Sequence, residues 1–132
     1  MAPPIVLVVD DDLPIRTLMQ NLLREFRFQP LTAGSGEEAV AVARDTRPDV
    51  VLLDLHMPGM SGEETLTALR RDAGLTTTPI VILTGEPMSE EQLRDLGAWA
   101  GIQKPFDLPH LVDLIRRAAA AEQAGGERPT VR

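Results

Sequence analysis

Three aspartates and a threonine draw attention in this chain because each follows a short run of apolar residues. The placements are Asp10 and Asp11 after "IVLVV" (5–9), Asp54 after "VVLL" (50–53), and Thr84 after "IVIL" (80–83). An ionised carboxylate is costly to bury without a partner. The pattern therefore predicts a site that requires negative charge where these runs end.

A cation explains the acidic residues best. If the runs are parallel strands in the order 2-1-3-4-5, the first and third are neighbours, and Asp10, Asp11 and Asp54 converge. Two like charges roughly 4 Å apart cost about 4 kcal/mol at an effective dielectric constant near 20. The single Lys104 cannot offset three carboxylates. An all-oxygen ligand set favours Mg²⁺, so we predict a magnesium site.

Such a site suits phosphoryl transfer. A carboxylate can attack phosphorus and form an aspartyl phosphate. Mg²⁺ and Lys104 would neutralise the transferring group, and the Thr84 hydroxyl could donate a hydrogen bond to it. The chain has no glycine-rich phosphate loop of the Walker type. We therefore expect the donor to be another protein or a small phosphodonor, and not a bound nucleotide.

Composition restricts the class further. The 132 residues are 43% hydrophobic and 25% charged, which predicts one globular domain. The absence of cysteine excludes disulfides, thiolate metal sites and a cysteine nucleophile. A net charge of -7 argues against nucleic-acid binding. No stretch suits a signal peptide or a membrane span, so we expect a cytoplasmic protein that does not contact membranes.

Alternating elements predict the fold. The three apolar runs are β-branched and continuous, as in parallel strands covered on both faces. Weaker strands are predicted near 28–33 and 101–104. Segments with helical spacing of apolar residues alternate with the strands, and they are 15–26, about 37–45, the segment after 62, about 90–96, and 108–119. We predict a doubly wound α/β fold of the flavodoxin-like type, with five parallel strands in the order 2-1-3-4-5 and five helices.

The ends of the domain and its weakest helix can also be predicted. The domain is expected to span 1–123, followed by a flexible tail at 124–132. The helix at 90–96 carries only Leu93 and Leu96 as clear apolar anchors. It should be the least firmly held part of the domain.

Four motifs relate the chain to a known family. "VLVVDDD", "VVLLDLHMPGMSG", "VILTG" and "QKPF" occur in this order and at the spacing found in response-regulator receiver domains of two-component signalling. The chain resembles these domains over residues 4–121. The resemblance implies a stand-alone phosphorylatable signalling module, and not an enzyme beyond catalysing its own phosphorylation and dephosphorylation.

The resemblance also implies roles for individual residues. Asp54 is expected to be the phosphoacceptor. Asp11 and Asp54 are expected to bind Mg²⁺ directly, together with the backbone carbonyl of His56, and Asp10 through water. Thr84 and Lys104 are expected to contact the phosphoryl group.

The expected switch surface departs from the family pattern. Lys104–Pro105 is expected to be a cis peptide bond, as is usual in receivers. Receivers usually carry an aromatic residue three positions before this lysine, where this chain has Gly101. Trp99 is the only tryptophan, and it is a candidate substitute or a partner contact. We expect Trp99, Gly101 and Pro105 to belong to the switch or partner surface.

The resemblance implies partners and leaves rivals open. The expected partners are a histidine kinase or histidine phosphotransferase and a downstream protein, with the chain a monomer or a phosphorylation-dependent homodimer. One rival is a receiver-like module that docks constitutively. Another is a phosphohydrolase with Asp10 as nucleophile, because Asp10 and Asp12 form the Asp-x-Asp pair of such enzymes. The acid that becomes phosphorylated distinguishes these possibilities.

Overall fold

Strands and helices alternate along the whole described chain. The structure is a computed structural model that describes the backbone of residues 2–124. The elements are β1 (Ile5–Val9), α1 (Leu13–Glu25), β2 (Gln29–Ala33), α2 (Gly36–Thr46), β3 (Val50–Asp54), α3 (Gly62–Arg71), β4 (Ile80–Thr84), α4 (Glu90–Leu96), β5 (Ala100–Gln103) and α5 (Leu108–Ala124). Apart from Ala124, which belongs to α5, the predicted tail at 124–132 lies outside the described residues.

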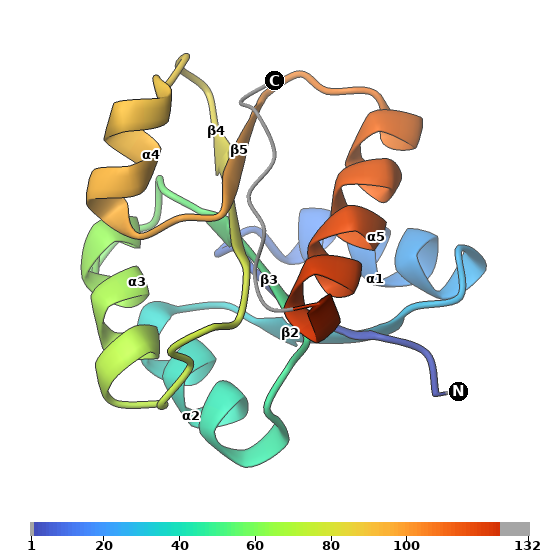
Figure 1. Ribbon diagram of the computed structural model, residues 1–132, viewed down its shortest axis with the longest axis horizontal. Coiled ribbons are helices and arrows are strands. Elements are labelled where there is room, and N and C mark those ends of the chain that lie inside the picture. The colour runs from blue at the N-terminus through green and yellow to red at the C-terminus, as the bar shows by residue number, and fades with distance from the viewer. Residues whose placement is uncertain (1, 125–132) are drawn as a thin grey trace.

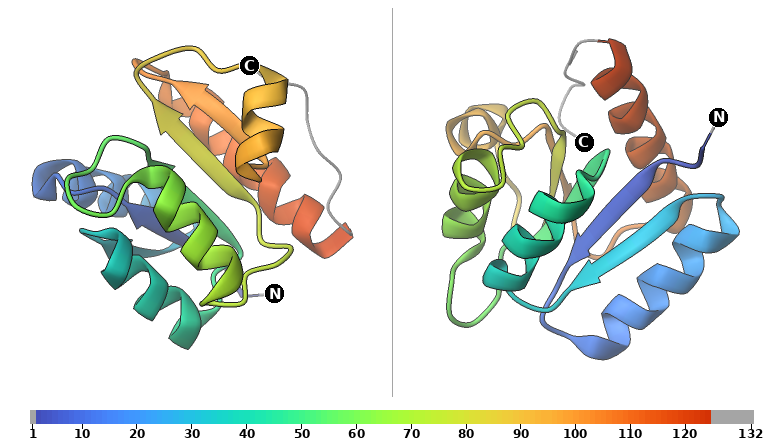
Figure 2. Two further views of the ribbon diagram at one scale, coloured as in Figure 1. Left: turned by 90° about the vertical axis from the view of Figure 1, so that its left-hand side faces the viewer. Right: turned by 90° about the horizontal axis from the view of Figure 1, so that it is seen from below.

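The five strands form one parallel sheet in the order β2-β1-β3-β4-β5. The predicted fold class and strand order are therefore confirmed. Helices cover both faces of the sheet, as the views in Figures 1 and 2 show. Because all strands run in the same direction, their carboxyl ends meet at one edge of the sheet.

Alternate residues of each strand enter two separate cores. On one face, Val6, Val8, Val50 and Leu52 pack with residues of α1 and α5 such as Leu23. The other face uses the residues between these, for example Leu7 and Leu53, and packs them with α2, α3 and α4. Burial on both faces explains why the central strands read as continuous apolar runs.

Element boundaries agree with the predictions to within a few residues. β3 and β4 each include the polar residue that follows the apolar run, Asp54 and Thr84. β5 begins one residue earlier than predicted and ends before Lys104. α4 spans Glu90–Leu96, as predicted, and only Leu93 of this helix is fully buried.

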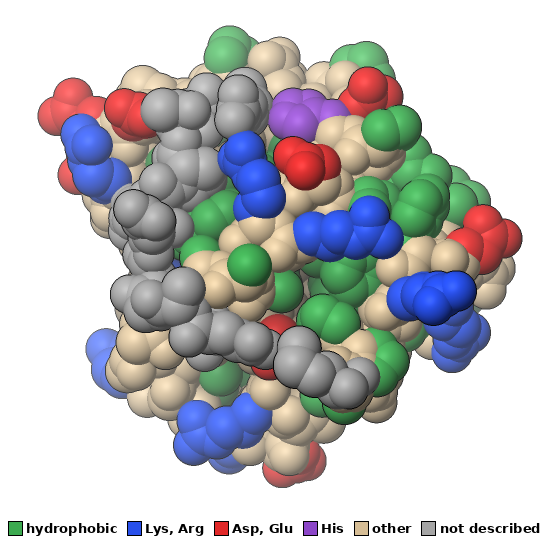
Figure 3. Space-filling view, turned by 45° about the vertical axis from the view of Figure 1, so that its right-hand side comes forward, with side chains coloured by type: hydrophobic (Ala, Val, Ile, Leu, Met, Phe, Trp, Pro, Cys, Tyr) green, Lys and Arg blue, Asp and Glu red, His purple; other side chains and the backbone are tan. Residues whose placement is uncertain are grey.

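Three large apolar side chains of α1 are exposed. Leu13, Ile15 and Leu18 are 62%, 39% and 58% exposed. Figure 3 looks toward the side of the molecule formed by α5 and α1, and hydrophobic side chains reach the surface there. Since only three residues separate Val9 from the start of α1, the first of these side chains lies near the carboxyl edge of the sheet.

None of the helices within residues 2–124 has both the length and the apolar character needed to cross a membrane.

Candidate functional site

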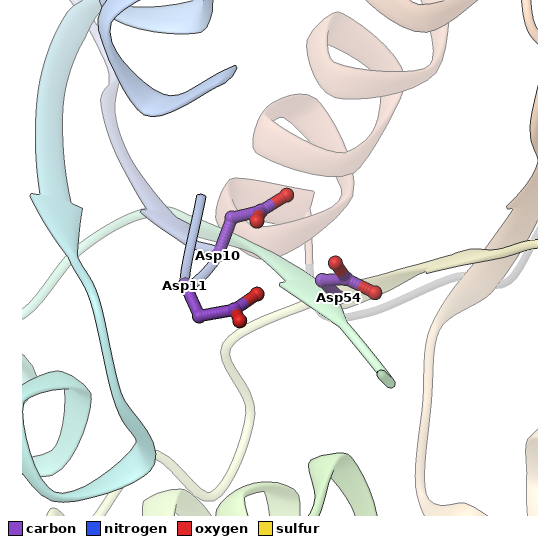
Figure 4. Close-up of side chains that lie close together, drawn as sticks. All are labelled: Asp10, Asp11 and Asp54. Carbon is purple, nitrogen blue, oxygen red and sulfur yellow. The ribbon is translucent and has the colours of Figure 1, made fainter. Parts of the chain in front are cut away.

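The carboxyl edge of the sheet gathers polar side chains in an otherwise apolar environment. Asp10, Asp54 and Thr84 are only 1%, 5% and 4% exposed, whereas Asp11 is exposed. β1 and β3 are adjacent, so the residues at their ends are brought together. One carboxylate oxygen from each of Asp10, Asp11 and Asp54 lies within 4.8 Å of the others. Figure 4 shows the three carboxylates directed into the same space.

Asp10 is the member of this cluster whose negative charge is least well stabilised. Its Oδ1 accepts a hydrogen bond from the Asp12 backbone N–H at 2.9 Å. Its Oδ2 is buried and has no hydrogen-bond partner among the described residues. Burial raises the pKa of Asp10 above 3.8, and the charges of Asp54 and Asp11 raise it further, while the Asp12 N–H and Lys104 act against the rise. The protein alone therefore leaves this carboxylate short of stabilisation.

Asp54 is better stabilised than Asp10. Its Oδ1 accepts a hydrogen bond from the His56 backbone N–H at 2.9 Å. Its Oδ2 lies 3.4 Å from the Lys104 ammonium, with the Asp54 side chain 7% and the Lys104 side chain 35% exposed. Lys104 is the only lysine of the chain. Its backbone N–H donates to the Thr84 carbonyl at 2.7 Å, and Lys104–Pro105 is a cis peptide bond. The ammonium therefore lies within ion-pair distance of the Asp54 carboxylate.

The Thr84 hydroxyl is engaged within its own loop. It donates a hydrogen bond to the Glu86 carbonyl at 3.0 Å and accepts one from the Glu86 backbone N–H at 3.1 Å. The residue therefore lies at the predicted edge of the sheet, but its hydroxyl is bonded to this loop and not to a carboxylate of the cluster.

Asp12 does not join the acidic cluster. It is the N-cap of α1, and its side chain accepts a hydrogen bond from the Ile15 N–H at 3.1 Å. A phosphohydrolase that uses Asp10 as nucleophile would need Asp12 as its second acid. Asp12 is exposed and caps α1 instead, so it does not serve Asp10 in this way.

The structure buries two of the three residues predicted for the switch or partner surface. Trp99 is only 8% exposed and packs in the core on the α1 and α5 face of the sheet, together with Ala100 and Leu111. Its indole is large and mostly apolar, so burying it is favourable. Gly101 is buried in β5, while Pro105 is exposed. Of the three residues predicted for the surface, only Pro105 presents itself to solvent.

The space beside Gly101 is already filled. A Cβ atom placed on Gly101 would lie 3.0 Å from Leu93 Cδ2 and 3.4 Å from Leu93 Cδ1. The single fully buried residue of α4 therefore occupies the space that a side chain at position 101 would need.

Sequence reasoning missed Arg16. Its Nη1 donates a hydrogen bond to the Asp10 backbone carbonyl at 2.7 Å. One signal was available in the sequence. A basic residue near the start of a helix opposes the helix dipole, so its presence there calls for a specific partner.

The cluster has the composition of a hard-cation site. All its side-chain ligands are carboxylate oxygens, one of them buried and without a partner. Such donors suit Mg²⁺, which takes one or two carboxylates and retains several waters. The residues present therefore fit the predicted cofactor.

A doubly wound parallel sheet with clustered acids and a lysine at its carboxyl edge defines the class of phosphoacceptor signalling domains. The sequence matches the response regulator receiver domain family over residues 6–116. The chain belongs to this family, whose members serve two-component signalling and interact with histidine kinases.

Two groups of relatives support this assignment. The DNA-binding response regulator MtrA of Mycobacterium tuberculosis (strain ATCC 25618 / H37Rv) is 39% identical over 113 residues, which cover 84% of this chain and 48% of MtrA. The phosphate regulon transcriptional regulatory protein PhoB of Escherichia coli (strain K12) is 36% identical over the same length, covering 84% of this chain and 49% of PhoB. The chain thus spans about half the length of the curated relatives it matches.

The fold resembles solved receivers along most of its length. Vibrio cholerae chemotaxis protein CheY4 is 34% identical with a TM-score of 0.82, covering 89% of this chain and 99% of CheY4. The N-terminal domain of a response regulator receiver protein from Methanoculleus marisnigri JR1 is also 34% identical, with a TM-score of 0.71, covering 86% of this chain and 94% of that domain.

Proposed function

We propose that this receiver domain accepts a phosphoryl group on Asp54 in a Mg²⁺-dependent reaction and thereby changes its affinity for a protein partner. The observation that carries the proposal is the buried Asp10 Oδ2, which has no hydrogen-bond partner among the described residues and lies in a cluster of three acids. A stable fold tolerates such an atom best when a cation binds there.

The proposed ligands are those that the resemblance to receiver domains implies, and the clustering of the three acids supports them. Asp11 and Asp54 would bind Mg²⁺ directly, together with the backbone carbonyl of His56, and Asp10 would act through a bound water. Mg²⁺ bound in this way would offset the negative charge of the incoming phosphoryl group and of the acids.

The chain's own residues then perform the transfer. An oxygen of Asp54 attacks the phosphorus of a phosphohistidine or of a small acyl phosphate. A P–O bond forms, and the bond from phosphorus to the donor breaks, with its electron pair leaving on the donor. Lys104, now 3.4 Å from Asp54, moves its charge toward the new phosphoryl oxygens. The Thr84 hydroxyl exchanges its bonds to Glu86 for one to the phosphoryl group.

We propose a histidine kinase or a histidine phosphotransferase as the phosphodonor. The exposed apolar side chains of Leu13, Ile15 and Leu18 lie on α1, directly after the acids of the site. Exposed apolar side chains of this kind favour protein partners. The net charge of -7 disfavours direct contact with nucleic acid, so the downstream target is proposed to be a protein or a second copy of this chain.

Mass spectrometry tests the proposal directly. The protein is incubated with acetyl phosphate and Mg²⁺, and the mass and the modified peptide are determined. Wild type should gain one phosphoryl group on Asp54. Asp54→Asn should gain none, and wild type in excess EDTA should gain little. Asp12→Asn is the matched control, because asparagine caps a helix as well as aspartate does, and it should react like wild type.

The rival functions give different results in the same experiment. Phosphate on Asp10 would identify the phosphohydrolase chemistry. A folded wild-type protein that gains no phosphate and binds no Mg²⁺ would point to a constitutive docking module. Either result refutes the proposal.

A further inference from the structure

Arg16 reaches back from α1 to the acidic edge of the sheet. Its Nη1 donates a hydrogen bond of 2.7 Å to the backbone carbonyl of Asp10, six residues earlier in the chain. The same residue continues the helix, because its backbone N–H donates to the Asp12 carbonyl at 3.0 Å. The guanidinium is thus held against the loop that carries two of the three clustered acids.

Gly34 provides the surface on which the guanidinium rests. A Cβ atom placed on Gly34 would lie 2.6 Å from Arg16 Nη1, 3.1 Å from Cζ and 3.3 Å from Nη2. The φ angle of Gly34 is not in the left-handed region, so its backbone conformation alone would accept alanine. Glycine at this position therefore leaves the guanidinium room where it binds the Asp10 carbonyl, whereas a larger residue would push the flexible end of Arg16 aside.

The hydrogen bond from Arg16 completes the anchoring of Asp10. The Asp10 backbone N–H donates to the Ala33 carbonyl at 3.1 Å, and its carboxylate accepts from the Asp12 N–H at 2.9 Å. The carbonyl that Arg16 binds belongs to the peptide unit joining Asp10 to Asp11. Fixing this unit sets the direction in which the Asp11 side chain leaves the backbone. Asp11 is exposed, so packing contributes little to its orientation.

We propose that Arg16 is a positioning residue of the Mg²⁺ site and that Gly34 is required to admit it. Arg16 holds the Asp10–Asp11 peptide so that the Asp11 carboxylate faces Asp54. Gly34 leaves room for the guanidinium at the end of β2. The inference rests on the proposed function, because it assumes that these acids bind Mg²⁺.

The direction in which Mg²⁺ affinity changes when Arg16 is replaced distinguishes a positioning role from a purely electrostatic one. Arg16 carries a positive charge close to a proposed dication, so removal of that charge alone would strengthen Mg²⁺ binding. Loss of a residue that orients the ligands would weaken binding, typically by tenfold or more. The two mechanisms therefore predict opposite changes in the dissociation constant.

The experiment measures the Mg²⁺ dissociation constant by isothermal titration calorimetry, without any phosphodonor. Arg16→Met removes the hydrogen bond and the charge, and Gly34→Ala displaces the guanidinium but leaves the charge. Both should bind Mg²⁺ about tenfold more weakly than wild type. The double variant should be no weaker than Arg16→Met, because both changes remove the same contact. Arg24→Met, on the exposed side of the same helix, should bind like wild type.

The outcomes distinguish this inference from the proposed function. Wild type without Mg²⁺ affinity would refute both. Wild type that binds Mg²⁺, with unchanged or tighter binding in Arg16→Met, would refute only the role of Arg16. A Gly34→Ala variant with wild-type affinity would refute the need for glycine. Circular dichroism establishes that each variant is folded. If Arg16→Met does not fold, Arg16→Lys takes its place in the experiment. Arg16→Lys retains the charge but not the fork of donors, so it should also bind Mg²⁺ more weakly than wild type.

Discussion

Neutralising Asp10 should stabilise the metal-free protein. Asp10 is 1% exposed, one of its oxygens has no partner among the described residues, and two further acids lie beside it. In Asp10→Asn, the amide keeps the shape of the side chain. Its oxygen can retain the bond from the Asp12 N–H, while its NH₂ can donate to the neighbouring carboxylates. The substitution therefore replaces the repulsion between Asp10 and the neighbouring carboxylates with a hydrogen bond to them.

The size of the effect follows from the distances. The carboxylate oxygens lie within 4.8 Å of one another. A pair of unit charges at that separation costs about 3.5 kcal/mol at an effective dielectric constant near 20, and about 0.9 kcal/mol in water. Asp11 is exposed and Lys104 opposes the repulsion, so the net gain should lie between these limits, at about 1–3 kcal/mol. For a domain of this size, that raises the melting temperature by roughly 4–10 °C.

Thermal unfolding followed by circular dichroism tests this in EDTA and in millimolar Mg²⁺. Mg²⁺ binds the folded wild type, so it should raise the wild-type melting temperature. It should raise that of Asp10→Asn less, because one acid of the site is neutral. The advantage of the variant should therefore be large in EDTA and small in Mg²⁺.

The pH dependence gives a second check. Because the pKa of Asp10 is raised above 3.8 in the folded protein, the wild type loses stability as the pH rises from this value through the folded pKa. Well below pH 3.8, Asp10 is protonated in both the folded and the unfolded state, and the difference in stability between wild type and Asp10→Asn should disappear. Asp12→Asn, two residues away, should show neither effect. An Asp10→Asn protein that melts at or below the wild-type temperature in EDTA would refute the reasoning.

Three further predictions concern glycines and the lysine. Gly36→Ala should destabilise the domain by about 1–3 kcal/mol in urea unfolding, because the new Cβ would overlap the Thr65 hydroxyl, while an unchanged midpoint would contradict the packing. Gly101→Phe should lower stability by a similar amount, and Leu93→Ala in the same chain should restore part of it, since the ring needs the space of that leucine. Lys104→Met should slow phosphorylation by acetyl phosphate roughly a hundredfold in a mass-spectrometric time course. A rate within threefold of wild type would exclude a direct role for the ammonium.

The fold and the position of the site could be predicted because they depend on simple patterns. Strands covered on both faces must be apolar at every position, so β1, β3 and β4 stand out as continuous runs. A carboxylate or hydroxyl is costly to bury at the end of such a run, yet Asp10, Asp54 and Thr84 are all buried there. Since the ends of parallel strands meet, these exceptions indicate one site.

The details that escaped prediction depend on where side chains point. Trp99 precedes a strand, and its ring is buried because it packs with residues of α5 and of the sheet that are distant in the sequence. Arg16 looks like one more surface charge until the loop before α1 brings the Asp10 carbonyl within its reach. The bonding of the Thr84 hydroxyl to Glu86 likewise depends on a loop conformation that no periodic pattern encodes.

The packing around α4 restricts how the site can communicate with the surface. Leu93 fills the space beside Gly101, so no ring at that position can swing between two orientations. The carboxyl end of α4 is tied to α3, because Arg70 Nη2 donates to the Gly97 carbonyl at 2.7 Å. Its amino end begins at the Ser89 cap, only five residues after Thr84. We therefore expect a pull on the Thr84 hydroxyl to reach α4 through residues 85–89 and to move the start of the helix more than its end.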